Sequence, residues 1–273
     1  MKFLTIVLLS FIFISCESKK NEVLLERDQA LEAIHSNTKM IEIPTGSYVP
    51  FFGQDSIQKV LVEGFLIDET LVTNADFLIF LKANPQWCRS KVLKIYADDN
   101  YLKNWKSDFE TPENIDLNAP VTNVSWYAAK AYAEAVGKRL PSVDEWEFVG
   151  ISNSVMPDAS NLPEFTNEIL KSYQIGERFK TPVKINKANY YQVYDMYGSV
   201  WEWTSDFNSV MITGESRNNN IKNEDLFCAG ASLTATDLKN YAAFIRFAMR
   251  GSLKANYCIS NLGFRCVKDI PKM

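Results

Sequence analysis

The part of this sequence that decides the fold reads PVTNVSWYAAKAYAEAVGKRLPSVDEWEFVG and occupies residues 120–150. Its first half predicts a helix, because Ser125 is a favourable N-cap residue and Gly137 is a favourable helix end. Between these two residues the larger and apolar side chains recur at helical spacing. They form one stripe: Trp126, Ala129, Ala133 and Val136. We therefore expect a helix that packs one face against the core.

A second helix is predicted directly after the first. Ser142 and Glu145 have the spacing of a capping box, in which each side chain bonds to a backbone N–H near the other residue. Trp146 and Val149 follow at helical spacing. Core packing is the default role of a tryptophan in such a pattern, because its ring buries about 150–250 Å². The same role is expected for Trp126, Trp201 and Trp203.

The segments before this region predict strands and one more helix. Residues 41–48 and 59–67 alternate apolar and polar side chains, as a half-buried strand does. Thr73 or Asn74 then caps a helix that ends before Pro85. The large apolar residues of that helix lie on one side: Phe77, Phe80 and Leu81.

The segments after residue 150 are less regular. They contain many turns and short pieces with a strand-like composition, such as residues 241–249. With its helices early and its irregular β structure late, the chain is predicted to fold as an α+β protein with little regular secondary structure.

The N-terminus has the parts of an export signal. Lys2 supplies the positive start, residues 3–14 are almost wholly apolar, and the small Ser15 precedes Cys16. The apolar part is shorter than the about 20 residues that span a bilayer. The residues before Cys16 are similar to the lipobox that lipoprotein signal peptidase recognises. We expect a signal peptide over residues 1–15 and a lipidated Cys16; the alternative is an ordinary secretory signal with a chance cysteine.

The remaining chain divides into a tether and one domain. Residues 16–39 are mostly polar and contain no aromatic residue. Within them, residues 24–34 favour a helix. Residues 40–273 are rich in apolar side chains and are long enough for a substantial core. We expect a lipid anchor on the inner or outer membrane of the cell envelope, with the domain in the periplasm or at the cell surface.

Composition excludes several classes of function. The formal net charge is −4 and no basic run stands out, which argues against a nucleic-acid surface. The one histidine, His35, lies in the expected tether, so the domain lacks the histidine of catalytic triads and of the usual zinc and iron sites. A metal in the domain would need oxygen ligands, which suit calcium, or thiolates, which suit Cu(I).

Five segments, in this order, are similar to the formylglycine-generating enzyme family, also called sulfatase-modifying-factor domains. They cover residues 43–48, 65–74, 120–148, 193–204 and 261–266. The resemblance implies a single compact α+β domain related to C-type lectins. It also implies an enzyme that oxidises a substrate cysteine to formylglycine.

The same resemblance implies a copper site whose usual ligands are absent here. Active family members hold Cu(I) with two cysteines shortly after a Gly-Gly-Ser segment. The matching Gly-Ala-Ser segment here ends at Ser232, and the two cysteine positions hold Ala235 and a residue near Ala242. Alanine has no thiolate to offer, so copper is not expected at the usual site. Ser232, which matches a serine close to that site, remains as the candidate catalytic residue.

Assigning Cys16 to the lipid leaves four cysteines. They are Cys88, Cys228, Cys258 and Cys266. An even number in an oxidising compartment is compatible with two disulfides in any of three connectivities, and buried free thiols are the other ordinary state. Cys228 and Cys258 are also the candidates for a displaced thiolate copper site.

A calcium site is a further implication of the resemblance. Relatives bind calcium through an Asn and a Glu in the segment that matches residues 198–203. Here Glu202 is retained and Ser199 replaces the Asn, so these two residues are the candidate ligands. A hydroxyl can ligate calcium, but the loss of an amide oxygen lowers the expected affinity.

Two functions follow from these observations, and they leave open whether the protein is an enzyme. The first is maturation of a protein or metalloenzyme in the cell envelope, since some segments are similar to the branch of the family found beside copper nitrite reductases. The second is a non-catalytic binding or assembly component of a surface or periplasmic complex. Either function requires a protein partner or client. A related iron-dependent sulfoxide synthase is excluded because it needs histidine ligands.

Overall fold

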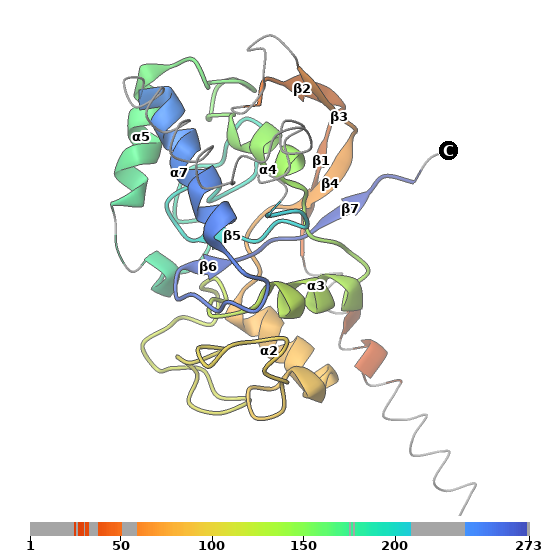
Figure 1. Ribbon diagram of the computed structural model, residues 1–273. Helices are drawn as coiled ribbons and strands as arrows, with labels where there is room; N and C mark the ends of the chain where they lie inside the picture. Colours follow the sequence, from red (N-terminus) through yellow and green to blue (C-terminus); the bar gives the residue numbers. More distant parts are fainter. Residues whose placement is uncertain are drawn as a thin grey trace, which may run out of the picture.

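A computed structural model describes residues 38–50, 59–174, 176, 178–208 and 238–271, with short helical pieces at 25, 27–29 and 31–32. The ribbon in Figure 1 shows the main sheet on one side, α5 and α7 side by side on the other, and α4 between them. Cys16, Cys228, Ser232 and Ala235 lie outside the described residues.

The main sheet has the strand order β1-β4-β7, with antiparallel neighbours. Its strands are β1 (Met40–Ile43), β4 (Phe65–Asp68) and β7 (Val267–Asp269). Two further pairs are antiparallel β2 (Gly46–Tyr48) with β3 (Val60–Val62), and parallel β5 (Trp201–Glu202) with β6 (Leu262–Gly263). The predicted strands before residue 70 are therefore confirmed, and each predicted run is divided in two by a turn.

The three helices predicted from local sequence are present. They are α2 (Asn74–Ala83), α3 (Trp126–Ala135) and α4 (Val143–Gly150). Thr73 caps α2 in a capping box with Asp76, and Ser125 caps α3. Gly137 has φ +68°, the left-handed conformation that commonly ends a helix. Short 3₁₀ turns, η1 (Pro85–Trp87) and η2 (Arg178–Lys180), lie in the connecting segments.

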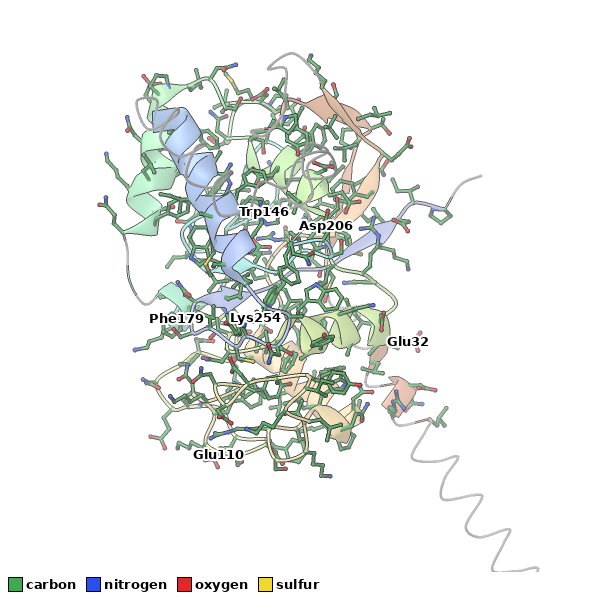
Figure 2. All side chains as sticks on the ribbon, in the orientation of Figure 1. Glu32, Glu110, Trp146, Phe179, Asp206 and Lys254 are labelled. Atoms are coloured by element: carbon green, nitrogen blue, oxygen red, sulfur yellow. The ribbon has the colours of Figure 1, made fainter. Side chains whose placement is uncertain are left out.

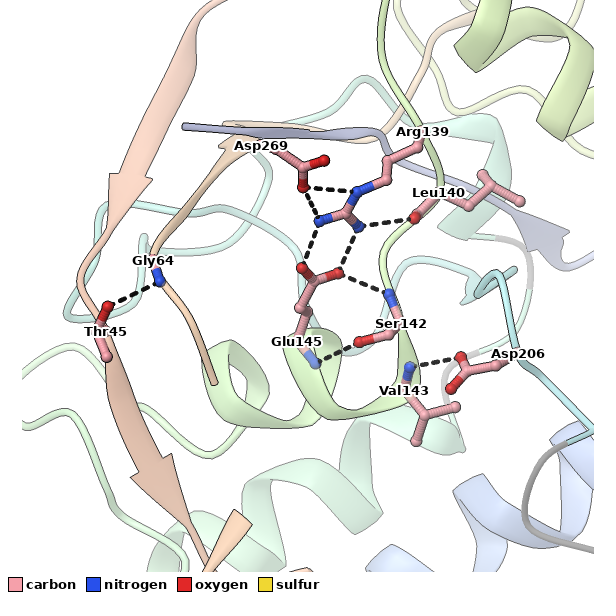
Figure 3. A network of polar contacts seen from close by, with 9 residues as sticks. All are labelled: Thr45, Gly64, Arg139, Leu140, Ser142, Val143, Glu145, Asp206 and Asp269. Atoms are coloured by element: carbon pink, nitrogen blue, oxygen red, sulfur yellow. Dashed lines mark hydrogen bonds and ion pairs between the residues drawn. The ribbon is translucent and has the colours of Figure 1, made fainter. Parts of the chain in front are cut away.

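The start of α4 is tied to the sheet by a polar network (Figure 3). Ser142 and Glu145 form the predicted capping box. Arg139 donates to both carboxylate oxygens of Glu145, at 2.6 and 2.7 Å, and also to Asp269 on β7. This network fixes the direction in which α4 enters the core, and with it the positions of Trp146 and Glu147.

Two helices after residue 150 were not predicted. The strand-like prediction for residues 241–249 is wrong, because this segment lies inside the helix α7 (Leu238–Ser252). A short apolar run without Gly or Pro fits a buried helix as well as a strand, and tertiary packing decided the outcome. Helix α5 (Pro163–Tyr173) begins with proline at its first turn and buries Phe165 and Ile169, which lie one turn apart.

Three apolar clusters make up the core. The largest lies around α2 and α3 and includes the fully buried Phe77, Phe80 and Trp203. Leu31, from the expected tether, is 7% exposed and belongs to this cluster, and Arg27 donates to Asn84 at 3.0 Å. Part of the segment expected to be a tether therefore packs on the domain. No helix in the described part of the chain is long and apolar enough to cross a membrane.

Candidate functional site: a cavity beside helix α7

A cavity of about 300 Å³ lies where α4 and α7 meet the segment around β5 and β6. Most of its walls are aromatic or aliphatic side chains, including Trp146, Phe179, Trp201 and Leu253. The charged residues in its lining are Glu202, Arg246 and Arg250. Figure 2 labels Trp146 near the middle of the molecule and Phe179 nearer its edge. A volume near 300 Å³ is at the small end of ligand sites.

One buried carboxylate next to this cavity holds two arginines. Glu147 Oε2 accepts from Arg246 Nη2 at 2.8 Å, and Glu147 Oε1 accepts from Arg250 Nη1 at 2.6 Å. The side chains of all three residues are at most 7% exposed. Arg246 and Arg250 are four residues apart on α7, so they point from the same face of that helix. The result is one negative and two positive charges, buried together.

The arginines determine the ionisation of Glu147. Burial alone would raise the pKa of this carboxyl group, because it disfavours the charged form. The positive charges and hydrogen bonds of Arg246 and Arg250 outweigh burial and lower the pKa of Glu147 to about 2. The carboxylate is therefore ionised at any physiological pH.

Several hydrogen-bond donors around the cavity are unused. Trp146 Nε1 and Tyr197 Oη are buried and have no hydrogen-bond partner in the described part of the chain. Their rings meet edge to face, with centroids 5.6 Å apart. Among the described residues, Arg250 donates one hydrogen bond, to Glu147, and its Cζ atom lies 4.9 Å from the centre of the Trp146 ring. Arg246, in contrast, bonds to Glu147, Tyr173 and the Ala242 carbonyl.

The predicted calcium ligands are not arranged as a calcium site. Both oxygens of Glu202 accept from Arg265, at 2.7 and 3.0 Å, and both side chains are 0% exposed. Ser199 lines the cavity instead. A calcium ion needs six to eight oxygen ligands, and a carboxylate paired with a guanidinium is not free to supply two of them. In this arrangement Glu202 does not fit calcium.

The described cysteines are three separate, buried free thiols: Cys88, Cys258 and Cys266. Burial raises the pKa of each thiol, and nearby acids raise it further, with Asp98 beside Cys258 and Asp68 beside Cys266. None is bridged to another, so the predicted disulfides among these three are absent. Any pairing with Cys228 lies outside the described residues.

Of the candidate copper pair, Cys258 lies in the described part of the chain, where its thiol is buried, whereas Cys228 lies outside it. Ala242, at the approximate position of one family cysteine, is 3% exposed and packs with Phe165 and Ile169. Among the described residues there is no group of three or more His, Cys, Asp or Glu that could hold a metal.

Sequence reasoning missed the main charged feature of this site. Glu147 stood inside the quoted stretch but was interpreted only as part of the scaffold. Arg246 and Arg250 were not singled out at all. A signal was available: two arginines four residues apart in an otherwise apolar segment indicate buried cations, which need a buried acid as partner.

Several known proteins are similar in sequence to this chain over most of its length. The model of the family described as sulfatase-modifying factor enzyme 1-like domain matches residues 27–270. The mouse (Mus musculus) formylglycine-generating enzyme is 29% identical over an alignment of 283 positions, gaps included. The alignment covers 85% of this chain and 75% of the relative. The formylglycine-generating enzyme of Streptomyces coelicolor is 29% identical over 266 residues, with 82% and 84% covered. A cattle (Bos taurus) relative, named inactive C-alpha-formylglycine-generating enzyme 2, is 28% identical over 253 residues, with 78% and 80% covered.

These matches extend over almost the whole described domain. They confirm the resemblance drawn from the five sequence segments, and the observed mixture of small sheets and short helices agrees with the α+β fold that it implied. The chain belongs to the sulfatase-modifying factor enzyme 1-like family, which is the family of the formylglycine-generating enzymes.

Proposed function

We propose that this protein is a lipid-anchored protein of the cell envelope whose domain binds a polypeptide during protein maturation or assembly, without copper-dependent oxidation of cysteine. The observation that carries the proposal is the composition of the cavity. In the described part of the chain its lining combines aromatic walls with two buried arginines and contains no cysteine. Such a site can hold a ligand in a fixed orientation, but it offers no thiolate to bind copper.

The relatives are compatible with a binding role. Relatives that are 28–29% identical over most of this chain include two named formylglycine-generating enzymes and one named as inactive. Membership of the family therefore does not by itself imply catalysis, because function depends on the groups in the site. In this chain, Ala235 and a residue near Ala242 stand where the copper-binding cysteines are expected, and no cysteine occurs between Cys228 and Cys258.

The first test concerns copper. The purified chain is expected to bind no stoichiometric Cu(I) through its thiols and to consume no oxygen with a cysteine-containing peptide. Copper binding is followed by competition with a chromogenic Cu(I) chelator, and oxygen by an electrode. The Streptomyces coelicolor relative, treated identically, serves as the positive control. Stoichiometric Cu(I) binding that is lost in Cys228→Ser would contradict the proposal and support a displaced copper site.

The second test concerns the lipid anchor. Cys16→Ala is expected to release the protein from the membrane fraction, because the acyl chains on this cysteine would supply the membrane affinity. Fractionation of cells and labelling with a fatty acid measure the effect. Cys88→Ala is the matched control and should stay in the membrane with its label. Retention of Cys16→Ala in the membrane would refute lipidation and favour another mode of attachment.

A further inference from the structure

We infer that the cavity beside α7 binds the carboxylate group of a peptide, through Arg250 and the indole N–H of Trp146. The inference rests on the proposed function, since it names the chemical group that the polypeptide client would present.

The charged residues that line the cavity, counted with their direct ion-pair partners Glu147 and Arg265, carry a net positive charge. Glu202 is neutralised by Arg265, at 2.7 Å, so this pair contributes no net charge. Glu147 faces two cations, Arg246 and Arg250, which leaves one positive charge in excess within this cluster. Buried charges are costly unless they are paired. A ligand with one negative charge would balance the cluster.

Another acid lies near Arg250 but does not line the cavity. Arg250 lowers the pKa of Asp206, although burial raises it by more. One oxygen of Asp206 accepts a hydrogen bond from the backbone N–H of Val143 at 2.8 Å (Figure 3). Asp206 and Arg250 attract each other electrostatically, and no hydrogen bond joins them in the described part of the chain. Its carboxylate leaves the unused donors of Arg250 in place.

The unused donors suit a carboxylate in number and kind. A guanidinium has five N–H donors in a planar fork that matches a carboxylate, and Arg250 uses one of them. Trp146 Nε1 is a donor only, it is buried, and it has no partner. Arg250 and Trp146 both line the cavity, and the Arg250 guanidinium lies 4.9 Å from the centre of the Trp146 ring. A carboxylate has two oxygens that can accept from both donors and a charge opposite to that of Arg250, whereas a neutral primary amide has a single acceptor oxygen and no charge.

The rest of the cavity suits the apolar part of a peptide. Phe179, Met249 and Leu253 contribute to its walls, along with Trp201. An aromatic or aliphatic residue next to the carboxylate would bury its side chain there. The carboxylate itself has two possible sources, the C-terminus of a chain or a Glu or Asp side chain, and the experiment separates them.

The experiment uses the full-length chain in a mild detergent and four small probes. N-acetyl-phenylalanine carries a terminal carboxylate, and its amide is the neutral match. N-acetyl-Phe-Glu-amide carries a side-chain carboxylate, and N-acetyl-Phe-Gln-amide is its neutral match. We expect one acid or both to bind about tenfold more tightly than the matched amide, as a charge-assisted hydrogen bond implies. Calorimetry gives the affinities, and the ¹⁵N-indole spectrum shows whether the Trp146 N–H signal shifts.

Three variants assign the binding to the cavity. Arg250→Lys keeps the positive charge but lacks the planar guanidinium. Trp146→Phe keeps an aromatic ring but lacks the indole N–H. Each substitution is expected to reduce the affinity for the acids several-fold. Lys254→Gln removes a positive charge one turn further along the chain from Arg250. Lys254, labelled in Figure 2, is exposed and is not one of the residues that line the cavity, so this control should bind as the parent chain does.

These outcomes test the carboxylate inference separately from the proposed function on which it rests. Equal affinity for acids and amides, or no binding of any probe, would overturn the carboxylate inference. Inorganic sulfate serves as an additional probe, and tighter binding of sulfate than of either acid would also overturn the inference. An equal loss of acid affinity in Lys254→Gln and Arg250→Lys would do the same. In each case the proposed function stands unless the copper test above also fails.

Discussion

Glu147→Gln is expected to destabilise the folded protein by about 3–5 kcal/mol, the usual cost of breaking a buried ion pair by removing one partner. The substitution keeps the shape of the side chain but leaves Arg246 and Arg250 buried without the carboxylate that both contact, at 2.8 and 2.6 Å. The uncompensated cations, rather than any cavity, cause the loss. A protein of this size should show a fall in Tm on the order of 10 °C.

Chemical and thermal unfolding of the purified chain measure this effect. Glu164→Gln is the matched control, because Glu164 is an exposed residue on α5 and its loss should change stability by less than about 0.5 kcal/mol. Equal stability of the Glu147→Gln variant and the parent chain would contradict the buried network. It would mean that water or another group compensates the arginines.

The pH dependence of stability gives an independent check on Glu147. The pKa of this carboxyl group is lowered from 4.5 to about 2 on folding, so the folded state binds the proton less readily than the unfolded state. The stabilisation is about 3 kcal/mol. It is fully present above about pH 4.5 and is lost as the pH falls towards 2. The stabilities of the parent chain and Glu147→Gln should therefore converge over that range, whereas a constant difference would argue against ionised Glu147.

The features that local sequence predicted are those that depend on neighbouring residues. Ser142 and Glu145 are three residues apart, and their capping box forms from backbone and side-chain geometry alone. The start of α2 at Thr73 is of the same kind. The family motifs likewise lie in short continuous segments, which is why the fold class could be predicted before the structure was known.

The features that were missed depend on contacts between distant segments. Residues 241–249 of helix α7 are apolar except for Arg246, and this composition fits a strand as well as a helix. The roles of Arg246 and Arg250 depend on Glu147, about a hundred residues earlier, which both contact. The pairing of Glu202 with Arg265 spans 63 residues in the same way. A carboxylate in a motif can bind a metal or a guanidinium, and the sequence of the motif alone cannot distinguish the two. The number of cysteines likewise permits disulfides, but the described Cys88, Cys258 and Cys266 are buried free thiols that lie apart from one another.

Arg265→Met is expected to be the other strongly destabilising substitution, again by about 3–5 kcal/mol. It would leave Glu202 at 0% exposure without a counter-charge. Arg265 also donates to the backbone carbonyl of Tyr194 at 3.0 Å, so its loss would leave that acceptor unpaired. Unfolding in denaturant measures the change. Arg139→Met is the comparison, since the Arg139 side chain is 37% exposed and its ion pairs should contribute about 1 kcal/mol or less.

The double variant Arg265→Met with Glu202→Leu distinguishes the cost of a broken pair from the value of an intact one. Replacing both members of a buried ion pair with apolar side chains is often nearly neutral, because the desolvation of both charges is avoided. We therefore expect the double variant to recover most of the stability lost in Arg265→Met. If it stays as unstable as the single variant, the carbonyl contacts of Arg265, and not its pairing with Glu202, hold this part of the core. In that case the carboxylate would be dispensable to the fold, and its use as a metal ligand would have to be considered again.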